Sequence, residues 1–248
     1  ARSFSSGSLD VARRLRAAGL NVVRGPATHD LDSVRAQLAT AVGWIAGTGP
    51  VSTIHLEAAP NLRVVARYGV GVDSVDLRAA HARGIVVTNT PGANAAAVAD
   101  HTIALLLAVL RGVVAGDRQV RAGDWRVGRS RELSALRVGL IGVGRIGRAV
   151  AGRLNGFGAA TCGIDPFLDD ELLRSLGVEP AGSAIPGDVD IVSLHAPGTT
   201  CIVDREWVAC ARSGLILVNA ARGTLVDEYA VADGIRSGRL GAYAADTL

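Results

Sequence analysis

Short apolar runs alternate with helix-like segments along the whole chain. Continuous apolar runs are typical of strands that are buried on both faces, as in parallel sheets. We expect strands over residues 21–24, 42–46, 62–67, 85–88, 138–141, 160–164, 191–194, 215–219 and 242–245. We expect helices over 9–18, 31–39, 76–82, 94–114, 203–211 and 227–237, one from Val51 and one with Ile146, Val150 and Leu154 on its apolar stripe. This alternation predicts an α/β fold with parallel sheets.

A glycine-rich turn joins the strand expected at 138–141 to the helix that follows it. Gly142, Gly144 and Gly147 have the GxGxxG spacing. In that spacing the first glycine permits a tight turn, the second lets backbone approach a pyrophosphate, and the third lets the helix pack on the strand. Asp165 ends the next strand, where an acid accepts the ribose hydroxyls of NAD and repels the 2′-phosphate of NADP. The pattern indicates a dinucleotide site; an ordinary strand-to-helix turn with a surface aspartate is the alternative.

Two further segments combine a strand end with groups that bind small anions. The loop 68–73 contains two glycines, and its consecutive N–H groups could form a nest for a carboxylate; a turn that needs glycine only for geometry is an equal alternative. Arg222 follows the strand at 215–219, and its planar guanidinium suits a 2-oxo acid because it grips the carboxylate and polarises the carbonyl. His195 ends the strand at 191–194, where we expect it to line a cofactor cleft rather than to donate a proton.

Composition and charge narrow the classes of partner. The chain has 248 residues, of which 49% are apolar and 20% charged, as expected for a globular protein with a sizeable core. The net charge of +3 comes from arginines scattered along the chain, and aromatic residues make up only 4%, so we expect no nucleic-acid binding. No apolar run approaches the roughly 18 residues that span a membrane. We therefore expect no membrane contact, and we expect no export signal.

The cysteines and histidines show no metal-ligand spacing, and we expect no metal. An odd number of cysteines without paired spacing favours free, buried thiols in the cytoplasm. These cysteines are Cys162, Cys201 and Cys210. Three of the histidines, His29, His55 and His81, are expected on the surface.

Seven segments in chain order make the chain similar to the D-isomer-specific 2-hydroxyacid dehydrogenase family. They are RYGVGVDSVD (67–76), NTPGANAAAVADHT (89–102), GLIGVGRIGRAVA (139–151), Asp165, VSLHAPGT (192–199), LVNAARGTLVDE (217–228) and GRLGAYAADTL (238–248). The resemblance implies two doubly wound parallel-sheet domains. The first, over residues 1–96, is a flavodoxin-like substrate domain that lacks its first strand and its C-terminal return. The second, over residues 97–248, is an NAD-binding Rossmann domain.

The resemblance also implies an NAD-dependent oxidoreductase, with a role for each matching residue. The amides of Val70 and Gly71 hold the substrate carboxylate, and Arg222 is the catalytic residue that binds the substrate. The residues implied to bind the cofactor are Thr102, Gly142, Gly144, Arg145, Ile146, Gly147, Asp165, His195, Pro197, Ala220 and Asp246, of which Asp246 contacts the nicotinamide carboxamide. The implied substrate is a small 2-oxo or 2-hydroxy acid, and the implied assembly is a homodimer.

The catalytic glutamate and histidine of the family belong to segments that would lie beyond Leu248. The chain also contains no lysine and no methionine, and we expect that the sequence is incomplete. A protein of the same fold that binds NAD(H) without catalysis, as a sensor or a partner-binding module, is the alternative from another class. A formate or phosphite dehydrogenase is the alternative within the enzymes.

Overall fold

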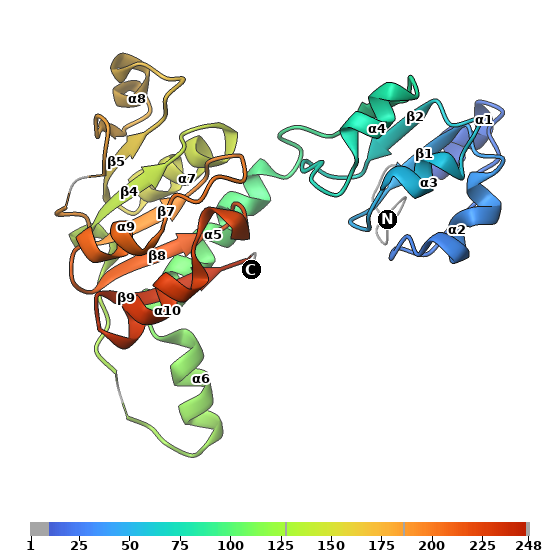
Figure 1. The fold of residues 1–248 in the computed structure, drawn as a ribbon. Coiled ribbons are helices and arrows are strands. Elements are labelled where there is room, and N and C mark those ends of the chain that lie inside the picture. The colour runs from blue at the N-terminus through green and yellow to red at the C-terminus, as the bar shows by residue number, and fades with distance from the viewer. Residues whose placement is uncertain (1–9, 127, 186, 247–248) are drawn as a thin grey trace. The chain divides into compact units, whose positions relative to one another are not determined.

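The computed structural model describes residues 10–126, 128–185 and 187–246. They form two compact units that meet between Asn94 and Ala95 (Figure 1); the boundary predicted from the sequence was at residue 96. Leu9, the first residue of the first predicted helix, and the last two residues of the final matching motif lie outside the described residues.

The first unit contains a three-stranded parallel sheet in the order β1-β2-β3. Its elements are α1 (Val11–Ala17), α2 (Leu31–Leu38), β1 (Gly43–Ala46), α3 (Thr53–Glu57), β2 (Val64–Arg67), α4 (Leu77–Ala82) and β3 (Val86–Thr88). Val65 of β2 is fully buried in the same cluster as Leu56 of α3 and Ala80 of α4. β2 is the central strand of the sheet, and its carboxyl end carries the loop 68–73.

The second unit contains a six-stranded parallel sheet in the order β6-β5-β4-β7-β8-β9. Its elements are α5 (Ala95–Leu110), α6 (Val113–Arg121), η1 (Leu133–Ala135), β4 (Arg137–Ile141), α7 (Arg145–Gly156), β5 (Ala160–Ile164), α8 (Asp170–Ser175), β6 (Glu179–Pro180), β7 (Ile191–Leu194), α9 (Arg205–Cys210), β8 (Leu215–Asn219), η2 (Gly223–Leu225), α10 (Glu228–Arg236) and β9 (Leu240–Ala245). Counted from β4, this is the 3-2-1-4-5-6 order of the Rossmann fold. The strand order reverses between β4 and β7, and ligands bind outside the carboxyl ends of the strands at such a point.

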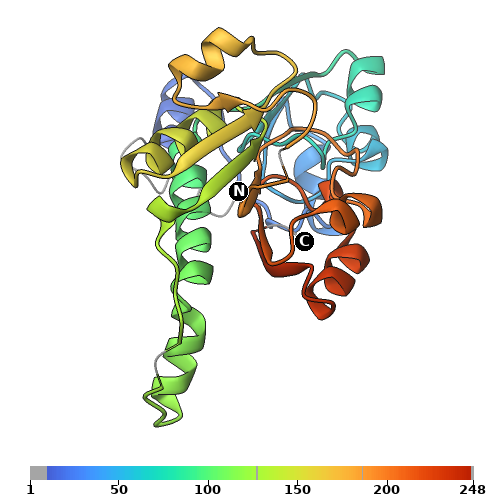
Figure 2. The same cartoon turned by 90° about the vertical axis from the view of Figure 1, so that its left-hand side faces the viewer.

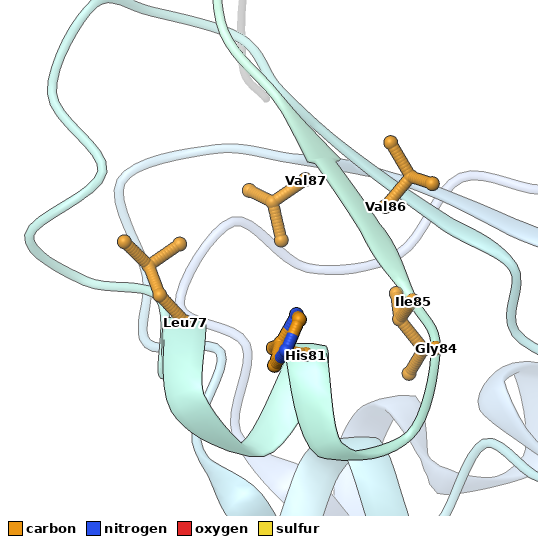
Figure 3. A pocket seen from close by; sticks show the side chains of 6 residues that line it. All are labelled: Leu77, His81, Gly84, Ile85, Val86 and Val87. Atoms are coloured by element: carbon orange, nitrogen blue, oxygen red, sulfur yellow. The ribbon is translucent and has the colours of Figure 1, made fainter.

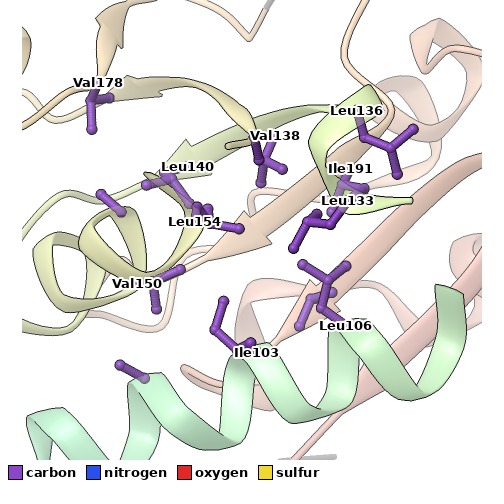
Figure 4. Close-up of a cluster of buried hydrophobic side chains, with 14 of the residues drawn as sticks. Ile103, Leu106, Leu133, Leu136, Val138, Leu140, Val150, Leu154, Val178 and Ile191 are labelled. Carbon is purple, nitrogen blue, oxygen red and sulfur yellow. The ribbon is translucent and has the colours of Figure 1, made fainter. Parts of the chain in front are cut away.

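Helices cover both faces of the six-stranded sheet. Ile103 and Leu106 of α5, together with Val150 and Leu154 of α7, pack on one face in the same cluster as Leu140 of β4 (Figure 4). On the other face, side chains of α9 and α10 pack against β7 and β8. Burial of both faces explains why these strands appear in the sequence as continuous apolar runs.

The helix expected over 94–114 is shorter than predicted. It ends at Leu110, Gly112 adopts a left-handed conformation with φ of 61°, and α6 begins after a bend of 59°. Valines on α6 continue the apolar pattern but are exposed, so the pattern overstated the buried length. Among the described residues no single helix is long and apolar enough to cross a membrane, and the bent pair α5 and α6 meets that test by length and composition only.

The other expected strands and helices are confirmed to within two residues, with one exception. Residues 21–24 form no strand, because they have no neighbouring strand among the described residues, and Val23 is 61% exposed. The helix expected from Val51 begins at Thr53, because Val51 forms a parallel bridge with Val75. The short elements α8 and β6 were not expected.

Two of the three histidines expected on the surface are buried. His29 and His55 are 2% and 4% exposed. Backbone groups take the place of water at their rings: His55 Nε2 lies 2.7 Å from the carbonyl oxygen of His29, and His29 Nδ1 lies 3.2 Å from that of Pro50. The surface prediction was wrong because these ring nitrogens are satisfied inside the unit. His81 is exposed, as predicted.

The three cysteines differ in burial. Cys162 lies in the core of the second unit, as predicted for a small apolar side chain. Cys201 and Cys210 are exposed, so the prediction of three buried thiols is wrong for these two. All three are free thiols.

Candidate functional site

The glycine-rich turn lies at the carboxyl end of β4, where the strand order reverses toward β7. Gly142 has φ of 94°, and a Cβ atom there would lie 2.7 Å from the backbone nitrogen of Ala196. A Cβ atom on Gly147 would overlap the carbonyl group of Gly142. Only glycines at these two positions allow the turn, helix α7 and the segment after β7 to approach so closely.

Gly144 faces open space, because a Cβ atom there would meet no atom within 4 Å. It is the N-cap of α7, and the first N–H groups of a helix have no partner inside the helix. Arg145 is exposed and Ile146 half-buried in the first turn. The open space and the helix amides fit a pyrophosphate. Contact of Arg145 and Ile146 with it stays a prediction.

Asp165 follows β5, and its carboxylate lies against the glycine-rich turn. Oδ2 accepts a hydrogen bond from the N–H of Val143 at 2.8 Å, and Oδ1 accepts one from the N–H of Phe167 at 3.0 Å. Nε of Arg148 donates to the carbonyl of Val143 at 3.1 Å. The backbone thus orients the carboxylate, and its remaining lone pairs can accept the hydroxyls of a ribose.

His195 lies directly after β7, beside the glycine-rich turn. The backbone N–H of His195 donates to the carbonyl of Ile141 at 2.7 Å. In its ring, Nε2 lies 2.9 Å from Oγ of Ser193. Nδ1 is buried and has no hydrogen-bond partner among the described residues, which fits a site that takes a further polar group. Burial lowers the pKa of His195 to about 4, so the imidazole is uncharged near neutral pH and is not suited to donate a proton. Pro197, in the same loop, is exposed.

Arg222 lies in the loop after β8, at the same carboxyl edge of the sheet. Asn219, fully buried at the end of β8, holds this loop. Nδ2 of Asn219 donates to the carbonyl of Arg222 at 2.8 Å, and its Oδ1 accepts from the N–H of Ala221 at 3.0 Å. Nη1 of Arg222 donates to the carbonyl of Ala221 at 2.9 Å. Ala220 is buried between these residues.

Asp246 lies at the end of β9 and is paired with a histidine. Nε2 of His101, on α5, lies 3.3 Å from Oδ1 of Asp246. The N–H of Asp246 donates to the carbonyl of Asn219 at 3.1 Å, which places this aspartate beside the Arg222 loop. Thr102 is buried, and its hydroxyl donates to the carbonyl of Val98 at 2.8 Å. A bond from that hydroxyl to the cofactor would therefore need a different rotamer.

In the first unit, Val70 and Gly71 lie on the loop after β2. Both residues are half-buried, and neither N–H has a hydrogen-bond partner among the described residues. Adjacent unpaired N–H groups of this kind fit a carboxylate. The role predicted for them stays a prediction.

The hollow shown in Figure 3 lies elsewhere in the first unit. Its lining comes from α4 and the beginning of β3: Leu77, His81, Gly84, Ile85, Val86 and Val87. The beginning of a strand lies at the opposite end of a parallel sheet from the loop 68–73. The lining is aliphatic apart from one imidazole, so it lacks the converging polar groups that orient an acid. Within the described ranges no group of three His, Cys, Asp or Glu side chains could hold a metal ion.

The strand order, the glycine-rich turn and Asp165 together define a dinucleotide-binding domain of the Rossmann type. Residues 103–248 match the family described as D-isomer specific 2-hydroxyacid dehydrogenase, NAD binding domain. The match covers more than half of the chain, and the chain belongs to this family. NAD is the cofactor of the matched domain, as the sequence predicted.

Known proteins that resemble the chain carry related names. It is 42% identical over 199 residues to D-3-phosphoglycerate dehydrogenase of Mycobacterium leprae, covering 78% of this chain and 38% of the relative. It is 39% identical over 202 residues to glyoxylate reductase of Korarchaeum cryptofilum, covering 77% and 60%. The structure resembles D-lactate dehydrogenase from Aquifex aeolicus complexed with NAD and lactic acid, with a TM-score of 0.82, 25% identity and coverage of 96% and 74%. The chain spans less than two thirds of the length of these two curated relatives.

Three residues at the site were not singled out from the sequence. Asn219 holds the Arg222 loop, His101 pairs with Asp246, and Arg148 bonds the glycine-rich turn. All three lie inside the matching motifs, and that position was the available signal. Their partners became visible only in the structure.

Proposed function

We propose that the protein is an NAD-dependent oxidoreductase that interconverts a D-2-hydroxy acid and the corresponding 2-oxo acid. The observation that carries the proposal is the position of Arg222. Its loop follows β8. In the same sheet, β4 leads into the glycine-rich turn and β7 leads into His195. A guanidinium at the carboxyl edge of a dinucleotide-binding sheet is well placed to bind an acid beside the cofactor.

The site residues of the second unit each have a defined part in this proposal. The N-terminus of α7, with Gly144, would hold the pyrophosphate, Asp165 the ribose and Asp246 the nicotinamide carboxamide. Bound NADH supplies the hydride. Arg222 binds the substrate carboxylate, polarises the adjacent carbonyl and stabilises the negative charge that develops on its oxygen during reduction.

The names of the relatives support the substrate class. D-3-phosphoglycerate dehydrogenase, glyoxylate reductase and a D-lactate dehydrogenase complexed with lactic acid are all named for 2-hydroxy or 2-oxo acids. We infer that this protein also takes a small acid of that class. A preference for NAD over NADP follows from Asp165, whose negative charge would repel a 2′-phosphate.

The test measures cofactor binding and turnover on the full-length protein. Fluorescence titration gives the affinity for NADH, and NADH oxidation is followed with glyoxylate, hydroxypyruvate, pyruvate and bulkier 2-oxo acids. We expect turnover with at least one acid, and a loss of about a hundredfold in kcat/KM for R222Q at unchanged NADH affinity. R236Q is the control, because Arg236 lies on the exposed end of α10 and pairs with Asp233. NADH binding without turnover on any acid would reject the enzyme and favour the non-catalytic NAD(H)-binding alternative.

We also propose that the protein is a homodimer that forms through α6. This helix has no buried residue, and Val113, Val114 and Val120 are 57%, 55% and 49% exposed. Figure 2 shows α6 extending from the end of α5, away from the six-stranded sheet. Exposed valines on a projecting helix favour burial against a second copy. Light scattering should give a dimer for wild type, a monomer for V114E/V120E, and a dimer for the control Y229E, which changes an exposed side chain of α10. A wild-type monomer would reject the proposal.

We place the protein in the cytoplasm. Cys162, Cys201 and Cys210 are free thiols, which supports a reducing compartment. Cell fractionation with an antibody against the protein tests this, and recovery outside the cytoplasmic fraction would reject it.

A further inference from the structure

Three consecutive carbonyl groups in the loop after β2 are held by other parts of the first unit. Nη1 of Arg67 donates to the carbonyl of Tyr68 at 2.6 Å. The N–H of Thr90 donates to the carbonyl of Gly69 at 3.1 Å. Nδ2 of Asn89 donates to the carbonyl of Val70 at 2.8 Å.

These bonds fix the direction of the N–H groups in the same peptides. A planar trans peptide points its N–H opposite to its C=O. When the carbonyls of Gly69 and Val70 are turned toward residues 89–90, the N–H groups of Val70 and Gly71 are turned away from them. Neither of these N–H groups has a partner among the described residues. The loop therefore presents two adjacent donors that are already oriented.

Arg67 is the charged side chain of this arrangement. It is the last residue of β2 and is half-buried. Its guanidinium lies directly over the loop, because a Cβ atom on Gly69 would be 2.8 Å from Nη1 and 3.2 Å from Cζ. Nε is buried without a hydrogen-bond partner, and no carboxylate pairs with Arg67 within the described part of the chain. Among the described residues, the loop thus places a guanidinium that pairs with no carboxylate next to two N–H donors that have no partner.

We propose that Arg67 is a positioning residue for the substrate carboxylate. It sets the Tyr68 peptide, lies over Gly69, and supplies positive charge to an anion held by the N–H groups of Val70 and Gly71. The chemical class of the ligand, the carboxylate of a 2-oxo acid, rests on the proposed function. The two donors and the adjacent charge act together, because a charge-assisted hydrogen bond is stronger than a neutral one.

The experiment uses oxamate, a carboxylate that is not reduced, as the probe. Its affinity is measured calorimetrically in the presence of NADH for wild type, R67Q and R67K, and the amide ¹⁵N and ¹H shifts of Val70 and Gly71 are followed during the titration. We expect R67Q to weaken oxamate binding by about tenfold or more, with NADH affinity unchanged. R67K keeps the charge but not the planar fork, and we expect an intermediate affinity.

The control is R63Q. Arg63 precedes β2 and is exposed, so this variant removes the same charge without touching the loop and should bind oxamate like wild type. Thermal unfolding of each variant shows whether the first unit is intact. If R67Q unfolds, R67K decides: weaker oxamate binding than wild type in a folded R67K supports the positioning role, and wild-type affinity rejects it.

Two outcomes would overturn the inference: wild-type oxamate affinity in R67Q, or no shift of the Val70 and Gly71 amides with oxamate in wild type. The proposed function fails separately. Oxamate shifts that depend on Arg67, in a protein that oxidises NADH with no 2-oxo acid, would keep the carboxylate site and reject the reaction.

Discussion

Replacing Gly147 by alanine is expected to force α7 away from the glycine-rich turn. The new Cβ atom would lie 3.0 Å from the carbonyl carbon of Gly142 and closer still to its oxygen. A backbone carbonyl in a turn cannot swing aside as the end of a side chain can, so the helix or the turn must shift. Overpacking of this kind costs about 1–3 kcal/mol. In a chain of this size each kcal/mol lowers the melting temperature by about 2–4 °C.

Gly152, on the same helix, provides a matched control. A Cβ atom there would meet no atom within 4 Å, and alanine is favoured over glycine inside a helix by about 1 kcal/mol. Thermal unfolding should therefore show a lower melting temperature for G147A and a higher one for G152A. A displaced turn also misplaces the amides at the start of α7, so we expect NADH to bind G147A about tenfold more weakly in fluorescence titrations. Equal stability and equal NADH affinity in the two variants would refute the packing role of Gly147.

Three further variants test an ion network, the cofactor preference and the Arg222 loop. The pKa of Asp190, which burial alone would raise, is lowered by hydrogen bonds from a backbone N–H and two arginines. Its stabilisation is therefore present at neutral pH and lost progressively as the pH falls below about 4; D190N should lose about 2 kcal/mol in urea unfolding at pH 7, and this loss should shrink as the pH is lowered below about 4. D165S should bind NADH about tenfold more weakly and lose its discrimination against NADPH, whereas D169S, which keeps a capping side chain at α8, should leave both affinities unchanged. N219D puts an acceptor against the carbonyl of Arg222, and we expect kcat/KM for the 2-oxo acid, measured at saturating NADH, to fall about tenfold.

The strands of the second unit could be predicted because they are buried on both faces. A run such as 191–194 is apolar at every position for that reason. The same rule failed where an apolar pattern was not buried. Residues 21–24 have too few apolar positions and no neighbouring strand among the described residues, and the valines after Gly112 are exposed on α6. The sequence shows where apolar side chains recur. Whether they are buried depends on which other segments of the fold cover them.

The site could be predicted in part for a similar reason. Gly142 and Gly147 were recognisable because close backbone approach excludes every other residue, which leaves a fixed spacing in the sequence. His101 and Asp246 pair across the unit from segments far apart in the chain, and no local spacing records such a contact. The burial that lowers the pKa of His195 also comes from surrounding elements and was not visible in its own segment.

The loop 68–73 of the first unit and the Arg222 loop of the second unit are each held by a polar side chain at the end of a strand. Arg67 bonds the carbonyl of Tyr68 at the end of β2, and Asn219 bonds the carbonyl of Arg222 after β8. Holding a carbonyl fixes its peptide plane, and the peptide plane fixes where the neighbouring donors point. In the first loop those donors are N–H groups; in the second, the bonds of Asn219 fix the backbone from which the Arg222 side chain extends. The bonds at the α7 turn do not involve Arg67, so changes at Arg67 should alter the affinity for the acid and leave that for NADH intact.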